Sequence, residues 1–334
     1  MTEKIRTLLV ATPSVREMVF SPESFARLEA LGELVVLDDP ADAGALIGSL
    51  PGTDVLITSW GATPLTAEVL EHADRLRLIA HSASSVKHFV TDEVFRHGLR
   101  ITQAGQAMAR PVAEVSLAFT LTMLHRIHRF DHAMHRGAAW RDAIDSPPQH
   151  GITSSRIGVV GASRTGLEYI AMIVALGADV VVYDPYLTDE RAQEIGVRRI
   201  ALDDLLRTSR VVALHAPTLP ETRDMIGARE LALMPDGAAL VNTARSWLVD
   251  SDALLAELRP GRIDAAIDVF DEEPLPVDSP FRGLSNVLLT PHRAAGTVEC
   301  YLEMGSIVAD ELERYVAGSD LRFELTEAAL ARMA

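Results

Sequence analysis

The amino-acid sequence predicts an α/β protein with two domains, each built on a doubly wound parallel sheet, and three observations carry that prediction. Short β-rich runs alternate with helical stretches along the chain, which is the pattern of parallel strands covered by helices on both faces. The alternation comes in two sets, separated by a loop with the sequence SPPQHG at residues 146–151. The 334 residues suffice for about two domains of ordinary size.

The first set supplies the first predicted sheet. Pro22 suits the first turn of a helix and Gly32 suits its C-terminal end. The predicted strands are Thr7–Ala11, Leu34–Leu37, Val55–Thr58, Leu76–Ala80 and Leu99–Thr102. The predicted helices are Pro22–Leu31, Ala41–Leu50, Thr66–His72 and a long one, Pro111–His135.

The second set begins at Arg156 and supplies the second predicted sheet. Its runs show the same alternation of strand and helix. The predicted strands are Ile157–Val160, Val180–Tyr183, Val211–Leu214, Ala238–Asn242, Ala265–Asp268 and Val287–Thr290. The predicted helices are Thr165–Leu176 and Thr297–Val316.

Composition and charge exclude several classes of protein. A net charge of −16 argues against nucleic acid as the main partner, because phosphate binding needs a basic face. The most apolar stretch, Ile170–Tyr183, is broken by Gly177 and Asp179, so we expect no membrane span. Cys300 is the only cysteine, which excludes an intramolecular disulfide and favours a reducing cytoplasm.

A glycine-containing turn, GASRTG, stands between a predicted strand and a predicted helix, where dinucleotides bind by their pyrophosphate. Gly161 permits the tight turn and Gly166 lets the helix pack closely on the sheet. Ser163 stands where a further glycine is usual, and its hydroxyl can donate to a phosphate oxygen. The candidate cofactor residues of this turn are Gly161, Ser163, Arg164, Thr165 and Gly166.

Asp184 ends the next predicted strand, 18 residues beyond Gly166, where the fingerprint expects an acidic residue after ~20. Its carboxylate can accept hydrogen bonds from the adenosine ribose and would repel a 2′-phosphate. We therefore expect NAD as the cofactor, and NADP is less favoured. The alternative is a plain βαβ crossover whose glycines serve only packing.

Three further predicted strands end in polar residues, within VNTARS, DVFDEEPLP and LLTPHRAAG. Loops at the carboxyl ends of parallel strands face the ligand crevice, so Arg245, Glu273 and His292 are expected to converge there. An arginine binds a carboxylate bidentately, and a histidine gives or takes a proton near neutral pH. A glutamate beside the histidine fixes the orientation of its ring. Each residue taken alone is more often a surface charge or a loop residue, and their joint appearance at strand ends is what favours a site.

These segments, in this order after GASRTG, resemble the D-isomer-specific 2-hydroxyacid dehydrogenase family over residues 156–311, as do LHAPTLPETRDMIG and RGAAW. The resemblance implies that Arg245 binds the substrate carboxylate, that His292 is the acid/base and that Glu273 is its partner. It also implies that Asp268 contacts the nicotinamide carboxamide. The other residues that it assigns to the cofactor pocket are Pro217, Thr243 and Ala244.

The resemblance also implies a domain organisation. A flavodoxin-like substrate-binding domain would comprise residues 1–104 and be completed by 298–334. A Rossmann NAD-binding domain would be inserted between them at 105–297. Proteins of this family dimerise through the nucleotide domain, so we expect a homodimer that binds a small 2-oxo or 2-hydroxy acid.

The N-terminal half departs from the family pattern. Serine and alanine replace the usual glycines in IAHSASSVKHFV, residues 79–90, although the loop amides still suit a substrate carboxylate. Lys87 in this loop is either a cation that faces the substrate or a solvated side chain. Arg293, after the histidine, is an unusual cation that would add positive potential for a second acidic group on the substrate. Trp60 is either a wall of the substrate pocket or a core residue. The candidate substrate residues are therefore Ser84, Ser85, Val86, Lys87, Trp60 and Arg245.

Four histidines, His125, His128, His132 and His135, recur at spacings of three, four and three, so we expect them to share one face of the long predicted helix. Four collinear imidazoles cannot surround one ion, and the arginines between them disfavour a cation, so we expect no metal.

Two other functions are compatible with the same residues. One is an NAD-sensing regulatory protein, of the corepressor type, that binds partners and turns over little. The other is a relative that oxidises a different small anion such as phosphite. A methyltransferase has a similar nucleotide turn, but it leaves Arg245, Glu273 and His292 unexplained.

Overall fold

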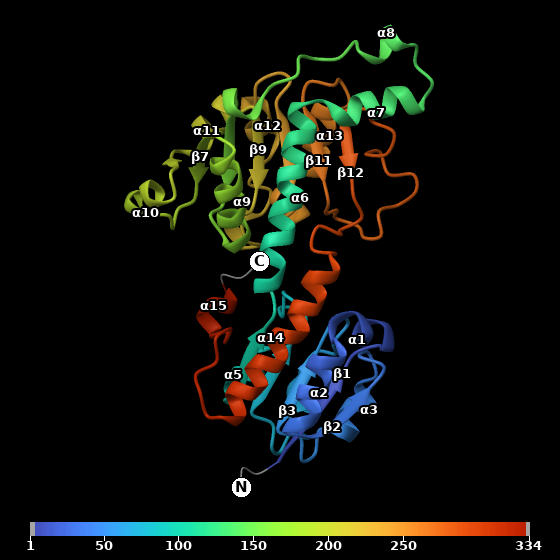
Figure 1. The fold of residues 1–334 in the computed structure, drawn as a ribbon, viewed down its shortest axis with the longest axis vertical. Helices are drawn as coiled ribbons and strands as arrows, with labels where there is room; N and C mark the ends of the chain where they lie inside the picture. Colours follow the sequence, from blue (N-terminus) through green and yellow to red (C-terminus); the bar gives the residue numbers. More distant parts are fainter. Residues whose placement is uncertain (1–3, 332–334) are drawn as a thin grey trace. The chain divides into compact units, whose positions relative to one another are not determined.

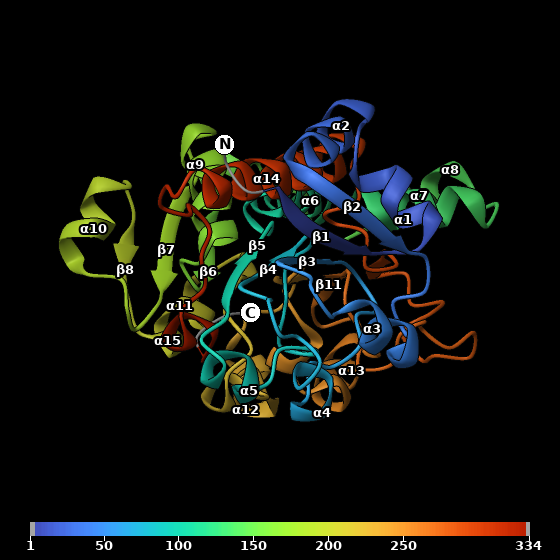
Figure 2. The ribbon, with the colours of Figure 1, turned by 90° about the horizontal axis from the view of Figure 1, so that it is seen from below.

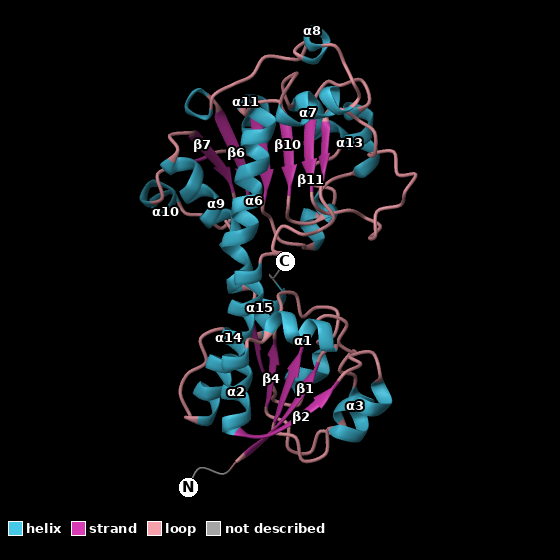
Figure 3. Cartoon of the chain, turned by 45° about the vertical axis from the view of Figure 1, so that its right-hand side comes forward, coloured by secondary structure: helices cyan, strands magenta, loops and turns pink. Residues whose placement is uncertain are grey.

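A computed structural model describes residues 4–331, and it divides the chain into two compact units. The first unit comprises the chain up to Met108 and again from Gly296, and the second runs from Ala109 to Ala295. Each unit contains one parallel sheet flanked by helices (Figure 3). The predicted α/β class with two doubly wound sheets is confirmed.

The first unit has a five-stranded sheet in the order β2-β1-β3-β4-β5, which is the flavodoxin-like order. Helices α1 and α2 each contact α14 on one face, and α3, α4 and α5 cover the other (Figure 2). The strands are β1 (Ile5–Val10), β2 (Gly32–Leu37), β3 (Val55–Thr58), β4 (Leu78–His81) and β5 (Arg100–Gln103). The helices are α1 (Pro13–Val19), α2 (Pro22–Leu31), α3 (Ala43–Ser49), α4 (Ala67–Leu70), α5 (Asp92–Arg96), α14 (Val298–Val316) and α15 (Glu327–Ala331).

The second unit has a seven-stranded sheet in the order β12-β11-β10-β9-β6-β7-β8. This is the Rossmann order with one added strand. The strands are β6 (Arg156–Val160), β7 (Asp179–Tyr183), β8 (Arg198–Arg199), β9 (Val211–Leu214), β10 (Ala239–Asn242), β11 (Asp264–Ile267) and β12 (Val287–Leu289). All of them are parallel, so the residues that follow each strand lie along one edge of the sheet.

Helices cover both faces of this second sheet (Figure 1). One core cluster joins α6 (Gln106–Leu124) and α9 (Arg164–Ala175) to one face. A second cluster joins α11 (Leu202–Thr208), α12 (Ala228–Leu233) and α13 (Ser251–Leu258) to the other. The remaining helical elements are α7 (Ile127–His135), α8 (Trp140–Ala143), α10 (Asp189–Glu194), η1 (Ile152–Ser154), η2 (Pro220–Thr222) and η3 (Ser246–Leu248).

Helix α6 is, by length and composition alone, apolar enough to cross a membrane, as the core helix of a globular domain also is. Its Ser116 bonds to Thr243, and its Thr120 bonds to Tyr169. Both partners belong to the second unit, so this helix lies in a protein core along that part of its length.

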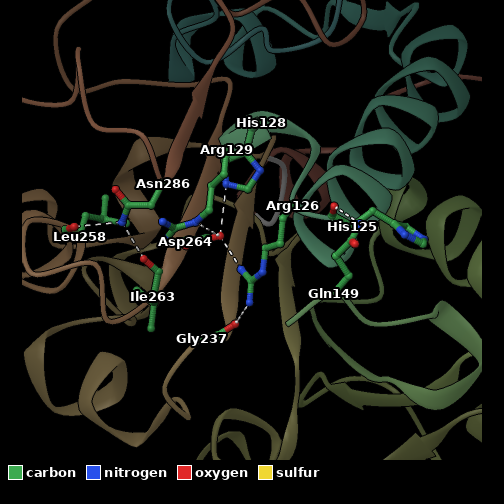
Figure 4. Close-up of polar contacts among 10 residues, drawn as sticks. All are labelled: His125, Arg126, His128, Arg129, Gln149, Gly237, Leu258, Ile263, Asp264 and Asn286. Carbon is green, nitrogen blue, oxygen red and sulfur yellow. Dashed lines mark hydrogen bonds and ion pairs between the residues drawn. The ribbon is translucent and has the colours of Figure 1, made fainter. Parts of the chain in front are cut away.

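The long helix predicted over Pro111–His135 is wrong at its start and in its continuity, whereas its predicted end at His135 is the end of α7. It begins earlier, at Gln106, and carries Pro111 inside it. It is also interrupted after Leu124, because Arg126 adopts a left-handed conformation with φ of 55° before α7 begins. The side chain of Arg126 is buried and binds Asp264 and the carbonyl oxygen of Gly237 (Figure 4). These tertiary bonds offset the local cost of a left-handed arginine.

Several short elements were not predicted from the sequence. They include α1, α5, α10, α11, α12, α13 and the two-residue strand β8. Helices of a few residues show little hydrophobic periodicity, so the packing of the unit determines where they form. The strands Val55–Thr58 and Val211–Leu214 and the helix Pro22–Leu31 have the predicted bounds.

Candidate active site

The turn between β6 and α9 is tight because two of its residues lack a side chain. Gly161 has φ of +97°, which glycine adopts without strain. A Cβ atom there would lie 2.6 Å from the backbone nitrogen of Ala216. A Cβ atom on Gly166 would lie 2.3 Å from the carbonyl oxygen of Gly161. The helix can therefore begin this close to the strand only with glycine at both positions.

Ser163 is the N-cap residue of α9, and Arg164 and Thr165 begin the helix. The Ser163 hydroxyl oxygen accepts a hydrogen bond from the backbone nitrogen of Gly166 at 3.3 Å. Serine therefore caps the helix at a position where a dinucleotide turn usually has glycine. The bond uses a lone pair, so the O–H group can donate to a phosphate oxygen at this helix N-terminus.

Asp184 follows β7 and lies beside the same turn. Its Oδ2 accepts from the backbone nitrogen of Ala162 at 2.7 Å, and its Oδ1 accepts from that of Tyr186 at 2.7 Å. Both bonds orient the carboxylate, and each oxygen keeps a lone pair for a ribose hydroxyl. The turn and Asp184 together fit the adenosine half of NAD, because the two glycines let the N-terminus of α9 lie close to the end of β6, where a pyrophosphate binds, and Asp184 faces the ribose position.

Thr243, another candidate cofactor residue, follows β10 and is held by a hydrogen bond between two hydroxyl groups. Its Oγ1 lies 2.7 Å from the Oγ of Ser116, and both side chains are buried. Ser116 was not predicted from the sequence. A signal was available, because Ser116 and Thr120 are spaced four residues apart and so share one face of a mostly apolar helix. Buried hydroxyls in such a position need partners.

His292 and Glu273 are in direct contact. The Nδ1 atom of His292 lies 2.7 Å from Oε2 of Glu273, and Oε1 of Glu273 accepts from the backbone nitrogen of Phe270 at 2.9 Å. An ionised carboxylate only accepts, so Nδ1 carries the proton and donates it. The Nε2 atom is then the one that exchanges a proton with a ligand. The imidazole side chain is 48% exposed, so it is accessible for that exchange.

Asp268 holds the backbone that carries His292. It is fully buried, and its carbonyl oxygen accepts from the His292 backbone nitrogen at 2.8 Å. Its carboxylate accepts from the Thr290 hydroxyl at 2.5 Å and from the backbone nitrogens of Arg293 and Ala294 at 2.9 and 3.0 Å. His292 itself has φ of 50°, a conformation that a non-glycine residue adopts only when its surroundings impose it. Asp268 thus fixes the backbone from which the imidazole of His292 projects.

Arg245 follows β10 in the same unit. Burial lowers the pKa of its guanidinium, and the negative charge of Glu273 opposes that shift. Its Nη1 atom donates to the carbonyl oxygen of Ala244 at 2.6 Å, and its own carbonyl oxygen accepts from Asn242. A guanidinium in such a position stays charged and has further N–H donors for a carboxylate. The structure thus brings Arg245 within electrostatic range of the Glu273–His292 pair.

The predicted substrate loop lies in the first unit, directly after β4. Ser84 and Ser85 are half-buried, Val86 is buried and Lys87 is exposed. The backbone of the loop is held by a bond from Ala104 to the carbonyl oxygen of Ala83. The loop amides are therefore presented on a fixed backbone.

Trp60, in the same unit, follows β3 and is partly exposed. Its ring meets that of Tyr301 edge to face, with 6.1 Å between the ring centroids. Tyr301 belongs to α14, and it was not predicted as a neighbour of Trp60. The contact joins two segments that are far apart in the sequence but adjacent in the unit, which periodicity does not reveal.

The prediction that four histidines share one helix face is wrong, because the helix is interrupted at Arg126. His125 precedes the interruption, whereas His128, His132 and His135 lie on α7. His128 is buried against Asp264, and His135 is exposed. Within residues 4–331, no group of three or more His, Cys, Asp or Glu side chains is arranged to hold a metal ion.

Comparisons with known proteins place these features in context. Residues 117–294 match the model described as D-isomer specific 2-hydroxyacid dehydrogenase, NAD binding domain. The glyoxylate reductase of Aeropyrum pernix is 31% identical over 304 residues, covering 89% of this chain and 90% of that protein. The D-3-phosphoglycerate dehydrogenase of Methanocaldococcus jannaschii is 32% identical over 293 residues, covering 87% of this chain and 55% of that protein. This chain thus spans about half the length of the D-3-phosphoglycerate dehydrogenases that it matches.

A solved structure is also similar to this chain in sequence and fold. The crystal structure of a phosphoglycerate oxidoreductase from Rhizobium etli is 30% identical to this chain, with a TM-score of 0.76. The match covers 96% of this chain and 99% of that one.

Proposed function

Because the chain belongs to the D-isomer specific 2-hydroxyacid dehydrogenase family, we propose that it interconverts a 2-oxo acid and a D-2-hydroxy acid with NAD. The observation that carries this proposal is the 2.7 Å contact between His292 and Glu273, in the unit that also contains the nucleotide turn and Arg245. Residues 117–294 match an NAD-binding domain, which confirms NAD as the cofactor.

In the proposed reaction, this chain binds the substrate and moves one proton. Arg245 holds the carboxylate through its N–H donors. In the direction of reduction, the hydride for the carbonyl carbon would come from NADH, held by the turn between β6 and α9 and by Asp184. The protonated Nε2 atom of His292 gives its proton to the carbonyl oxygen, and Glu273 holds the ring and stabilises its positive charge. In the direction of oxidation, the neutral imidazole takes the hydroxyl proton back.

We propose the first unit as the substrate-binding domain, with the amides of Ser84, Ser85 and Val86 as further donors to the carboxylate. Lys87, in that loop, and Arg293, beside His292, favour a diacid or an otherwise anionic substrate because each adds a positive charge. Kinetics of pyruvate-like monoacids and 2-oxo diacids, with wild type and Lys87→Ala, test this preference. The substitution is expected to weaken the diacid selectively, and equal effects on both classes contradict the proposal.

The function as a whole is tested by following NADH consumption with a panel of 2-oxo acids. We expect turnover of at least one of them, with a D-2-hydroxy acid as product. Two other functions lead to different results. An NAD-sensing regulatory protein binds NADH without turnover of any member of the panel, and a phosphite-oxidising relative reduces NAD with phosphite instead. No NADH binding at all would contradict all three.

Asp184 is expected to set the preference for NAD over NADP. Replacing it with serine removes the charge that repels a 2′-phosphate, while Gly161 and Gly166 still accommodate the pyrophosphate. We expect Asp184→Ser to raise kcat/KM for NADPH and to lower it for NADH, so that their ratio changes by about tenfold or more, the order of one charge–charge repulsion near a protein surface. The substitution Asp189→Ser, on the nearby helix α10, is the control. An unchanged ratio in Asp184→Ser contradicts the assignment.

We also propose a homodimer formed through the second unit. Four large apolar side chains of α7, α8 and their flanking residues are exposed: Ile127, Met134, Trp140 and Ile144. Grouped exposed apolar side chains are typical of interfaces. A monomer at micromolar concentration in sedimentation velocity contradicts this assembly.

A further inference from the structure

The second unit contains a pocket of about 320 Å³ that the proposed reaction does not use. It lies between the ends of β10 and β11, the first turn of α13 and the loop that follows β11. None of the residues assigned above to the cofactor or to the Arg245, Glu273 and His292 set lines it. Its volume is in the range of small-molecule sites.

The interior of this pocket is largely apolar, with the amide of Asn242 as its buried polar side chain. Leu254, Ile267, Val269 and Phe281 line it, and each of these side chains is at most 9% exposed. A ligand with an apolar body gains free energy by leaving water for such walls.

The charges that line the pocket are all negative. Asp271, Glu272 and Asp278 are among its lining residues and are exposed, whereas no lysine, arginine or histidine lines it. Asp271 also accepts from the Ser251 hydroxyl at the start of α13, which fixes that carboxylate. The nearby Arg282 has its guanidinium turned to the carbonyl oxygens of Leu275 and Pro276. The complementary ligand therefore carries a positive head group on an apolar body.

The pocket is lined by the loop that follows β11, which also carries Glu273. Residues 269–272 and 275–276 line it, whereas Glu273 and Pro274, between them, do not. Glu273 instead accepts from the Phe270 backbone nitrogen and contacts His292. A molecule that fills the pocket packs against both flanks of Glu273 and thereby restrains the residue that orients the imidazole.

We propose that this pocket is a binding site for a small amphipathic cation, a primary ammonium on an apolar chain or ring, whose binding orders the loop that carries Glu273. The effect on the loop rests on the proposed function of Glu273, whereas the binding itself does not. The binding measurement is therefore made separately from any assay of activity.

The test uses 2-phenylethylammonium as the probe, with the neutral 2-phenylethanol and the anion 3-phenylpropanoate as matched controls, each titrated into the full chain. Methyl resonances of Leu254, Ile267 and Val269 report binding at this pocket. We expect the ammonium to bind with a Kd on the order of 1 mM, from the usual efficiency of small ligands. It should bind about fivefold more tightly than the alcohol, the effect of an exposed ion pair, and the anion should bind weakest.

Two variants locate the site. Asp271→Asn with Asp278→Asn should reduce the affinity for the ammonium to that for the alcohol, whereas the control Asp236→Asn, an exposed carboxylate that does not line the pocket, should leave it unchanged. Ser279→Trp, which fills the pocket from its rim, should abolish binding of both. Equal binding of the three probes, or no shift of these methyl groups, overturns the proposal.

A second readout concerns the loop. Saturating ammonium should slow amide exchange of residues 270–275 severalfold, and unchanged exchange overturns the ordering effect. If the enzyme turns over no 2-oxo acid, both measurements still decide the proposal, so its failure is distinguishable from failure of the proposed function.

Discussion

Replacing His292 with alanine is expected to lower kcat by about 10²- to 10⁴-fold, the usual contribution of a positioned general acid or base. The Nε2 atom is the only group of this side chain that can exchange a proton, because Nδ1 is bonded to Glu273 at 2.7 Å. Alanine removes the proton donor but leaves the nucleotide turn and Arg245 in place. We therefore expect the Kd for NADH, measured by fluorescence titration, to stay within about twofold of wild type, since no assigned NAD contact is lost.

The control is His72→Ala, which removes an exposed histidine from the first unit. We expect that variant to keep wild-type kcat. Glu273→Gln separates orientation from proton transfer, because glutamine still accepts from the Phe270 backbone nitrogen but removes the charge that faces the imidazole. The decrease in kcat of Glu273→Gln should be smaller than that of His292→Ala and should vary with pH. A kcat for His292→Ala within tenfold of wild type would exclude this histidine as the acid/base.

The sequence predicted those residues of the candidate site whose positions depend on local structure. Gly161, Gly166 and Asp184 are set by a strand, a turn and a helix that follow one another, and each has a local pattern. Arg245, Glu273 and His292 each follow a strand of the same parallel sheet, so their proximity followed from topology. The sequence did not reveal that Ser163 caps α9, because the cap depends on the conformation of the turn.

The residues that hold the site depend on contacts between distant segments, and the sequence did not reveal these. The carboxylate of Asp268 is occupied by donors from Thr290, Arg293 and Ala294, a loop more than twenty residues further along the chain. Arg126 breaks the predicted helix because it binds Asp264, 138 residues away. Hydrophobic periodicity describes one helix at a time and carries no information on such a bond.

Replacing Asp264 with alanine is expected to reduce the free energy of unfolding of the second unit by about 3–5 kcal/mol, the usual effect of removing one partner from a buried ion pair. Asp264 begins β11 and is 1% exposed. Its carboxylate binds Arg126, Arg129 at 2.5 Å and His128 at 3.2 Å (Figure 4). Without it, Arg126, which is 2% exposed, keeps a buried charge with no carboxylate beside it. Urea unfolding of wild type and variant measures the difference.

Two controls separate the ion cluster from a general effect of substitution. Asp236→Ala removes an exposed carboxylate of the same unit, so we expect a change of less than about 0.5 kcal/mol. Asp264→Asn keeps the shape of the side chain and one acceptor oxygen but removes the charge. Its decrease in the free energy of unfolding should lie between those of Asp264→Ala and Asp236→Ala. A loss below about 1 kcal/mol in Asp264→Ala would mean that solvent or a rearranged α7 compensates Arg126.

The pH dependence of this loss follows from the pKa of Asp264. Burial raises that pKa, but the hydrogen bonds from His128 and Arg129 and the charges of Arg126 and Arg129 outweigh burial and lower it from 3.8 to about 2. A lowered carboxyl pKa stabilises the folded state above the unfolded value, and that stabilisation is lost as the pH falls towards about 2. The difference between wild type and Asp264→Ala should thus be constant above pH 5 and shrink below pH 3.8.

The same substitution should loosen one segment more than the rest of the unit. Asp264 holds Arg126 in the left-handed conformation from which α7 begins, and it binds Arg129 and His128 in the first turn of that helix. Without the carboxylate, only the bond from Arg126 to the carbonyl oxygen of Gly237 offsets the cost of that conformation, so the amides of α7 should exchange faster than those of α9, which lies on the same sheet but has no bond to Asp264. Amide exchange followed by mass spectrometry resolves the two helices. Equal acceleration in both would show that Asp264 stabilises the sheet as a whole and not the start of α7.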